Sequence, residues 1–239
     1  MFVEKHIQKF LEISEPPQDT FGLAPRKWAD RFPRNEIDDY DRLSPVKMTR
    51  RAVMDLCRDR TTSDLNVYIS IMAWGGQGSG VSFKHAKAAW ECRDEICEII
   101  HRLRSENPTK IQAFEWLNAA RINGLGPSFF TKLIAFISPE DGRVIMDQWV
   151  AKAVNLLTGR EFVKLAQGVP NRANDGFVYA QFCGLVAEIG LVAGIDDPWR
   201  AEERLFSSGG RKKGPWRQYV IEHWRPASRP ARHPRPDPL

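Results

Sequence analysis

Two short stretches of this 239-residue sequence combine residue types that can bind phosphate and carry out nucleophilic chemistry. Residues 122–132 read Ile-Asn-Gly-Leu-Gly-Pro-Ser-Phe-Phe-Thr-Lys, and residues 144–149 read Val-Ile-Met-Asp-Gln-Trp. The first stretch holds a glycine-rich turn followed by a lysine, and the second holds a single carboxylate. An anion-binding turn, an amine that attacks an electrophilic carbon and an acid that stabilises a cation would together form a reactive site.

The turn at Gly124 and Gly126 is predicted to connect two helices. Both glycines are expected to adopt backbone conformations that other residues avoid, and Pro127 is expected to begin the second helix. The amides of the turn would then remain unpaired beside the positive end of a helix, where a phosphate oxygen can accept their hydrogen bonds. The candidate phosphate-binding residues are Asn123, Gly124, Leu125, Gly126 and Ser128. A purely structural corner between two helices would use glycines in the same way.

Lys132 is the only charged residue between Pro127 and Ile137. A lysine buried among apolar side chains loses the solvation of its charged form, so its pKa falls and its amine becomes a usable nucleophile. In the alternative interpretation, the aliphatic stem of Lys132 crosses a buried face and its amine reaches solvent.

Asp147 is predicted at the start of a helix, because Val150, Val154 and Leu157 form one apolar face after it. An aspartate at this position commonly caps the helix, which is a structural role. The same position also keeps a carboxylate ordered beyond the end of the helix, so that it can stabilise a cation or position a water molecule.

The rest of the sequence predicts an all-α fold of about eight helices, with no convincing pair of strands. Apolar residues recur at helical spacing through most of the chain, and the glycine-rich run from Gly75 to Gly80 ends one buried helix in a loop. The helices are predicted at residues 1–13, 45–60, 63–74, 83–104, 109–120, 127–137, 147–157 and 177–192.

Composition divides the chain into three regions. Residues 1–45 are predicted to form a helix and an irregular arm, and residues 46–206 a helical domain with a helical hairpin at 112–137. Residues 207–239 hold eight Lys or Arg against two Asp or Glu in a chain of net charge +5, and are predicted to form a flexible basic tail rich in proline and arginine. Such a tail either attracts phosphates without specificity or only aids solubility.

No apolar run is long enough to span a bilayer, and the N-terminus lacks the apolar core of a signal peptide, so a cytoplasmic protein is expected. The four cysteines lack the paired spacing of metal sites and are expected to be buried free thiols. They are Cys57, Cys92, Cys97 and Cys183.

The turn, the lysine-bearing helix and the spaced aspartate together resemble the helix-hairpin-helix superfamily of DNA glycosylases, which includes endonuclease III and the 8-oxoguanine DNA glycosylases. Residues 68–77 are similar to the helix and loop that supply the residue filling the gap left by an extruded base, here Gln77. The resemblance covers about residues 60–160 and implies a two-lobed, all-α glycosylase fold. It also implies double-stranded DNA as partner, a monomer, a location at the nucleoid and a monovalent cation at the hairpin.

The sequence departs from the family pattern at two places. Lyase members carry a lysine two residues after the second glycine, where this sequence has Ser128, and Lys132 lies one helical turn later. The usual Val-Asp-x-His pattern becomes Met146-Asp147-Gln148-Trp149. The iron–sulphur cysteines of several relatives have no counterpart, so neither a cluster nor another cofactor is expected.

The resemblance favours a DNA glycosylase of the 8-oxoguanine type with AP lyase activity. Lys132 would attack the sugar C1′ and form a Schiff base, while Asp147 would assist deprotonation and stabilise the developing cation. Trp74, Gln148 and Trp149 are candidates for contacts with the flipped base.

Two alternatives remain open. In a monofunctional glycosylase, Asp147 would activate water and Lys132 would only contact phosphate. A non-catalytic DNA-binding module would keep the hairpin without the chemistry, and a role in phage defence would make a modified phage base the target.

Overall fold

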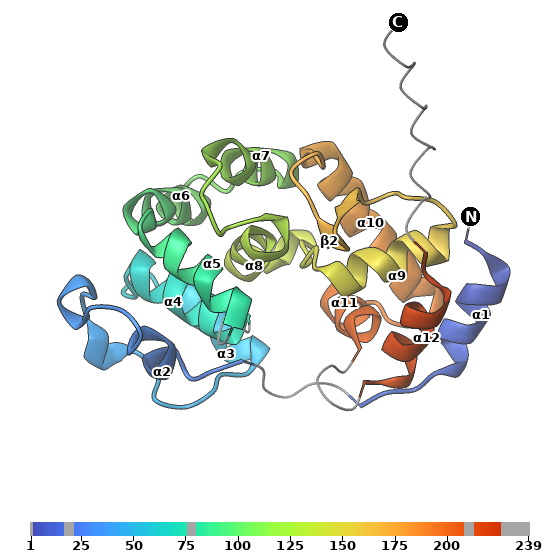
Figure 1. Ribbon diagram of the computed structural model, residues 1–239, viewed down its shortest axis with the longest axis horizontal. Helices are drawn as coiled ribbons and strands as arrows, with labels where there is room; N and C mark the ends of the chain where they lie inside the picture. Colours follow the sequence, from blue (N-terminus) through green and yellow to red (C-terminus); the bar gives the residue numbers. More distant parts are fainter. Residues whose placement is uncertain (1, 17–21, 76–79, 208–212, 226–239) are drawn as a thin grey trace, which may run out of the picture.

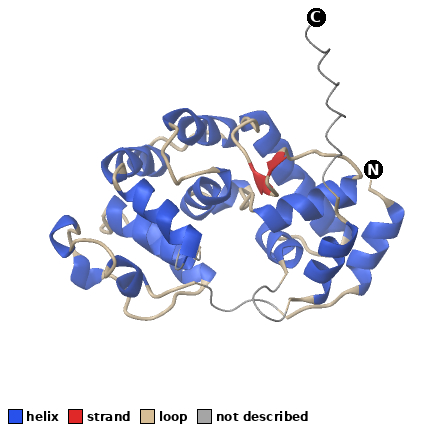
Figure 2. Cartoon of the chain, in the orientation of Figure 1, coloured by secondary structure: helices blue, strands red, loops and turns tan. Residues whose placement is uncertain are grey.

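The computed structural model describes residues 2–16, 22–75, 80–207 and 213–225, and this part of the chain is mostly helical (Figure 1, Figure 2). Its α-helices are α1 (Glu4–Glu12), α2 (Pro25–Ala29), α3 (Arg50–Arg58), α4 (Asp64–Trp74), α5 (Gly80–Trp90), α6 (Arg93–Ser105), α7 (Lys110–Ala120), α8 (Pro127–Ile137), α9 (Gln148–Thr158), α10 (Gly176–Val192), α11 (Pro198–Phe206) and α12 (Pro215–His223). Strands β1 (Leu165–Ala166) and β2 (Val169–Pro170) form one antiparallel pair. The predicted all-α fold is confirmed, and none of the described helices is long and apolar enough to cross a bilayer.

Helix α4 is the centre of the first lobe. The Ser63 side chain accepts a hydrogen bond from the amide of Asn66 and caps the helix, and every residue from Asn66 to Trp74 is buried. A helix that is apolar on all sides must be covered on all sides, and α4 packs against α2, α3, α6 and α8. Its C-terminal end reaches the boundary between the lobes, so Trp74 and Gly75 lie where the two lobes meet.

The second lobe consists of α1 and α9 to α12. Helix α9 packs against α1, α11 and α12, while α10 packs against α11 and also against α7 of the first lobe. Figure 1 shows α1 beside α12 although the two helices stand at opposite ends of the chain. The His6 ring joins them through a hydrogen bond of 2.8 Å to the Tyr219 hydroxyl.

The connection from α8 to α9 is buried from Arg143 to Met146, and this part fixes the position of the residue that follows it. The Thr131 hydroxyl donates to the carbonyl of Pro127 at 2.7 Å and accepts from the amide of Met146 at 3.1 Å. The Tyr179 hydroxyl donates to the carbonyl of Val144 at 3.0 Å. These contacts hold the chain on both sides, so Asp147 begins α9 at a defined place between the lobes.

One of the predicted regions is wrong in part. The predicted flexible tail contains α12, because Trp216 is 1% exposed and packs edge-on against Phe10 at 4.8 Å between ring centres. Residues 1–45 contain the predicted helix as α1, which packs on the second lobe, while α2 packs on α4 of the first. The error in the tail arises from contacts between distant segments, which local composition does not reveal.

The helix predicted at residues 83–104 is two helices in the structure. Helix α5 ends at Trp90 and α6 begins at Arg93. The Trp90 ring stacks on Phe32 at 4.2 Å, and its Nε1 donates to the Glu36 carboxylate at 2.8 Å. The change of direction lets Trp90 reach the segment around α2 while α6 turns its own apolar face to α4.

The helix predicted at residues 45–60 begins later, at Arg50. The Thr49 side chain accepts a hydrogen bond from the amide of Ala52 at 3.1 Å and caps the helix. The Ser44 hydroxyl bonds instead to the backbone of Val46. Serine and threonine are both common helix caps, so residue type alone does not decide between the two positions.

Candidate active site

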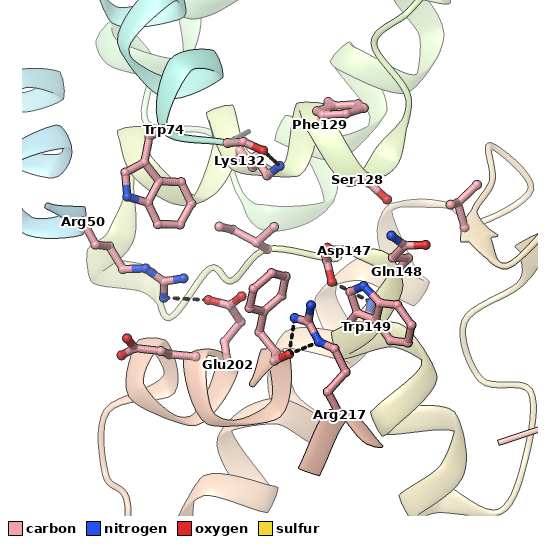
Figure 3. A pocket seen from close by; sticks show the side chains of 15 residues that line it. Arg50, Trp74, Ser128, Phe129, Lys132, Asp147, Gln148, Trp149, Glu202 and Arg217 are labelled. Carbon is pink, nitrogen blue, oxygen red and sulfur yellow. Dashed lines mark hydrogen bonds and ion pairs between the residues drawn. The ribbon is translucent and has the colours of Figure 1, made fainter. Parts of the chain in front are cut away.

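A cavity of about 320 Å³ lies between the two lobes and is lined by side chains from both (Figure 3). Helices α3, α4 and α8 contribute from the first lobe, and α9, α11 and α12 from the second. Six residues that the sequence singled out line this one cavity, and they are Trp74, Ser128, Lys132, Asp147, Gln148 and Trp149. Residues from separate parts of the sequence thus meet in one place.

Lys132 is buried on α8, with its amine at the cavity. The residue is 8% exposed, its Nζ donates to the carbonyl of Gly75 at 3.0 Å, and Nζ lies 4.8 Å from the centre of the Phe129 ring. A Cβ on Gly75 would lie 2.9 Å from Cδ of Lys132. The absence of a side chain at Gly75 therefore leaves the space that the lysine occupies, and the amine does not extend into bulk solvent.

The surroundings of Lys132 lower its pKa from the ordinary value. Burial is the largest cause, and the positive charge of Arg50 acts in the same direction. The carboxylates of Asp147 and Glu202 favour the charged amine and oppose the shift. Since the net pKa shift is downward, more of the amine is neutral, and hence nucleophilic, at a given pH.

Removal of this buried charge is expected to stabilise the fold. In the unfolded chain Lys132 titrates near its ordinary pKa of 10.5, whereas the folded-state pKa is lower. Protonation therefore favours the unfolded chain, and folding stability falls as the pH drops from 10.5 to the folded-state pKa. A Lys132→Met variant should be more stable than the parent by about 1–2 kcal/mol at pH 7, and less so at pH 10. Urea unfolding at both pH values measures this, and a variant less stable at pH 7 would contradict it.

Asp147 caps α9, and its carboxylate faces the same cavity. Its Oδ1 accepts hydrogen bonds from the amides of Trp149 at 2.6 Å and Val150 at 3.2 Å. Figure 3 shows Lys132 above and Asp147 below the same space. The capping role predicted for this residue is present, and it holds the carboxylate where its charge acts on Lys132.

A buried ion pair forms another part of the cavity wall. Nη1 of Arg50 lies 2.6 Å from Oε2 of Glu202, and the two side chains are 18% and 2% exposed. The guanidinium also packs against the rings of Trp74 at 5.1 Å and Trp199 at 4.7 Å. Burial raises the pKa of Glu202 to about 7, although Arg50 opposes the shift. No local motif points to this pair, because its members lie on α3 and α11.

Trp149 lies against two cations on the second-lobe side of the cavity. The guanidinium carbon of Arg217 lies 4.9 Å from a ring centre of Trp149, and the amine of Lys152 lies 4.3 Å from it. Nε of Arg217 donates to the carbonyl of Phe206 at 3.1 Å, which fixes the side chain. The sequence did not predict Arg217 at the site, because the segment that forms α12 was predicted to belong to the flexible tail. Gln148 lies next to Trp149 at the cavity edge (Figure 3).

The predicted glycine turn connects α7 to α8, and its two glycines differ. Gly124 has φ +78°, and a Cβ on it would lie 2.0 Å from the carbonyl oxygen of His85. Gly126 has φ −82° and ψ 177°, and nothing lies within 4 Å of a Cβ placed on it. The expectation of an unusual backbone conformation is confirmed for Gly124 and wrong for Gly126, whose Cα faces open space.

The amides of the turn are only partly unpaired. The amide of Leu125 donates to the carbonyl of Ile122 at 3.3 Å, so the predicted free amide is wrong at this residue. Within the described part of the chain, the amides of Gly124, Gly126 and Ser128 have no hydrogen-bond partner. Gly126 and Ser128 lie at the first turn of α8, where the helix dipole favours an anion.

A groove of about 680 Å³ follows the turn and meets the cavity. It is lined by residues 121–124 and Gly126, and it shares Ser128, Phe129 and Val169 with the cavity. A ligand that occupies the groove can therefore continue into the cavity between the lobes.

Gln77, the residue predicted to fill the gap of an extruded base, lies outside the described residues. Among the residues that the structure does describe, no group of three or more His, Cys, Asp or Glu side chains is placed to hold a metal ion. Cys57 and Cys183 are buried free thiols, while Cys92 and Cys97 are half-buried free thiols.

Comparison with protein families gives one match. A family model described as "Putative 8-oxoguanine DNA glycosylase OGG-like protein" matches residues 14–206. The matched range includes every residue that lines the cavity except Arg217. No curated protein sequence and no solved structure matches the chain significantly.

Proposed function

The chain belongs to the family of OGG-like 8-oxoguanine DNA glycosylases, and from this premise we propose that it excises an oxidised purine from double-stranded DNA through Lys132. The observation that carries the proposal is the buried amine of Lys132, which lines the same cavity as Asp147 and has a lowered pKa. An amine in such a position is a nucleophile suited to a sugar carbon.

The DNA backbone binds along the groove at the hairpin. The unpaired amides of Gly126 and Ser128 at the start of α8 donate to a phosphate oxygen, and the positive end of the helix favours the charge. The open space at Gly126 supports this role, since no contact within the described chain requires a glycine there. A side chain at this position would keep the phosphate away from the amides.

Substitution by alanine is expected to have different effects at the two glycines. Gly124→Ala should destabilise the fold by more than about 1–2 kcal/mol, because φ +78° strains an alanine and its Cβ meets the His85 carbonyl. Gly126→Ala should leave the free energy of unfolding within about 1 kcal/mol, yet weaken binding to a DNA duplex about tenfold. Thermal unfolding and fluorescence anisotropy measure the two effects. Normal DNA binding by a folded Gly126→Ala variant would contradict the phosphate-binding role proposed for the hairpin.

The flipped base enters the cavity between the lobes. A volume of about 320 Å³ lies at the small end of ligand pockets, which suits a single nucleobase. The ion pair of Arg50 and Glu202 offers donors and acceptors to the polar edge of a purine, and Trp74 offers an aromatic surface nearby. Trp149 and Gln148 line the opposite side.

Base release begins when the neutral amine of Lys132 attacks C1′ of the deoxyribose. A bond forms between the amine and C1′ as the bond from C1′ to N9 of the purine breaks. The electron pair of the broken bond leaves with the base, which takes up the proton that the amine releases. Asp147 stabilises the positive charge that develops on the sugar, because its ordered carboxylate faces the same space.

Strand cleavage follows from the same covalent bond. The sugar ring opens as O4′ takes up a proton, which leaves a protonated imine between Lys132 and C1′. Loss of a proton from C2′ then expels the 3′ phosphate and breaks the strand. Hydrolysis of the imine returns the free amine, so the enzyme acts again.

A monofunctional glycosylase is the second candidate, and Ser128 is the residue that favours it. The Ser128 hydroxyl is buried at the cavity and has no hydrogen-bond partner in the described part of the chain. A hydroxyl near Asp147 can orient an attacking water, in which case Lys132 acts as a positive charge and not as a nucleophile.

An excision panel tests the proposed function. Duplexes that carry oxidised, deaminated, alkylated or hypermodified bases are incubated with the protein, with and without borohydride. Release of 8-oxoguanine with a borohydride-trapped adduct is the expected result. Release without an adduct supports the monofunctional candidate, and no release from any duplex contradicts both.

A further inference from the structure

Arg172 follows strand β2, and its side chain donates hydrogen bonds to backbone oxygens of the hairpin. Its Nη1 donates to the carbonyl of Asn118 at 2.9 Å and to that of Leu117 at 3.3 Å. Its Nη2 donates to the carbonyls of Ile122 at 3.1 Å and Leu125 at 2.9 Å. One guanidinium thus binds four backbone oxygens, two from the last turn of α7 and two from the turn itself.

Two of these four oxygens, those of Ile122 and Leu125, belong to the turn at which the family resemblance implies a monovalent cation. A metal ion binds where several carbonyl oxygens converge, and here those oxygens already accept hydrogen bonds from Arg172. A second positive charge at the same oxygens would be repelled by the guanidinium. The residues present therefore do not fit the cation that the family resemblance implies.

The position of Arg172 is fixed independently of the hairpin. The side chain of Asn174 is fully buried, accepts from the amide of Lys164 at 2.8 Å and donates to the carbonyl of Lys164 at 2.9 Å. Asn155 binds the amide and carbonyl of Val163 in the same way, both at 2.8 Å. Two buried amide side chains thus lock the loop that carries Arg172, so its guanidinium is held in place before DNA binds.

We infer that the guanidinium of Arg172 is the resident cation of this hairpin, replacing a bound metal ion. It neutralises the negative end of α7 and polarises the peptide groups of the turn, and it lines the same groove as the turn. Arginine stays charged at any physiological pH, so this charge is permanent. The inference rests on the proposed function for its link to DNA, and it makes duplex binding independent of which monovalent cation is present.

The test compares cations at a constant ionic strength of about 0.1 M. Binding of an undamaged duplex is measured by fluorescence anisotropy in potassium, sodium and tetramethylammonium chloride. The parent protein should bind equally well in all three salts. An Arg172→Ala variant should bind about tenfold more weakly in tetramethylammonium, and potassium or added guanidinium should restore much of the loss. Arg172→Lys keeps a cation but has three donors for four oxygens, so it should bind more tightly than Arg172→Ala in tetramethylammonium and more weakly than the parent.

Arg121→Ala is the matched control, because Arg121 is exposed beside the same turn. This variant should bind more weakly to the same extent in all three salts. A parent protein that binds DNA much better in potassium would overturn the inference, and so would an Arg172→Ala loss that neither potassium nor guanidinium repairs. Melting temperatures of the parent and Arg172→Ala in the three salts give a second readout without DNA. Potassium should raise the melting temperature of the variant and leave that of the parent unchanged. If the melting temperatures behave in this way but the protein does not bind DNA, the proposed function is contradicted and the inference about Arg172 is not.

Discussion

A Lys132→Gln variant is expected to form no borohydride-trapped adduct and to lose at least about 10³-fold of the excision rate. Lys132 holds the amine that lines the cavity, and its burial keeps part of that amine neutral. Glutamine is one atom shorter, fits the space of the lysine and carries an uncharged N–H donor, so the fold should survive the change. Single-turnover excision on an 8-oxoguanine duplex and trapping on an abasic duplex measure the two losses.

Lys152→Gln is the matched control for this variant. Burial lowers the pKa of Lys152 too, and the charge of Asp147 acts on it, so it is the closest rival nucleophile. Its amine lies against Trp149 and does not line the cavity. The control should therefore keep both excision and adduct. If the adduct instead forms in Lys132→Gln and is absent in Lys152→Gln, then Lys152 and not Lys132 is the nucleophile.

An Asp147→Asn variant is expected to lose about 10²–10⁴-fold of the excision rate while its stability stays within about 1 kcal/mol of the parent. Asparagine keeps the oxygen that caps α9 and accepts from the amides of Trp149 and Val150. Only the negative charge is lost, and with it the stabilisation of the sugar cation. Excision kinetics and thermal unfolding on the same preparation separate the loss of charge from a loss of structure.

Asp175→Asn is the corresponding control, since Asp175 caps α10 in the same way and does not line the cavity. This variant should excise at the parent rate. A non-catalytic DNA-binding module would make Asp147→Asn and Asp175→Asn indistinguishable in every assay. Equal activity of the two variants would therefore remove Asp147 from the mechanism.

The elements that local sequence determines were predictable. The capping box of Thr109 and Gln112 begins α7, Pro127 begins α8, and Asp147 caps α9, each within a few residues of the helix that it starts. Lys132 was also a candidate for a local reason, because it is the one charged residue in an apolar helix. Each of these predictions depends on residues within one helix or next to it, so none of them required knowledge of tertiary contacts.

The opposite wall of the cavity was not predictable, because it depends on contacts between distant segments. Glu202 pairs with Arg50 across the two lobes, and Arg217 comes from a helix whose neighbours in sequence have the composition of a flexible tail. Arg172 binds carbonyls of the hairpin that lie 50 and 47 residues before it in the sequence. No spacing rule links these residues to the turn or to Lys132, so only the folded chain brings them together.

The attachment site of the trapped intermediate identifies the group that attacks the sugar. The protein is incubated with a duplex that carries 8-oxoguanine, reduced with borohydride and digested, and the modified peptide is identified by mass spectrometry. One reduced sugar adduct is expected, on the amine of Lys132 in the α8 peptide. An adduct on Lys152 or on the N-terminal amine, or excision of the base with no adduct at all, would contradict Lys132 as the nucleophile.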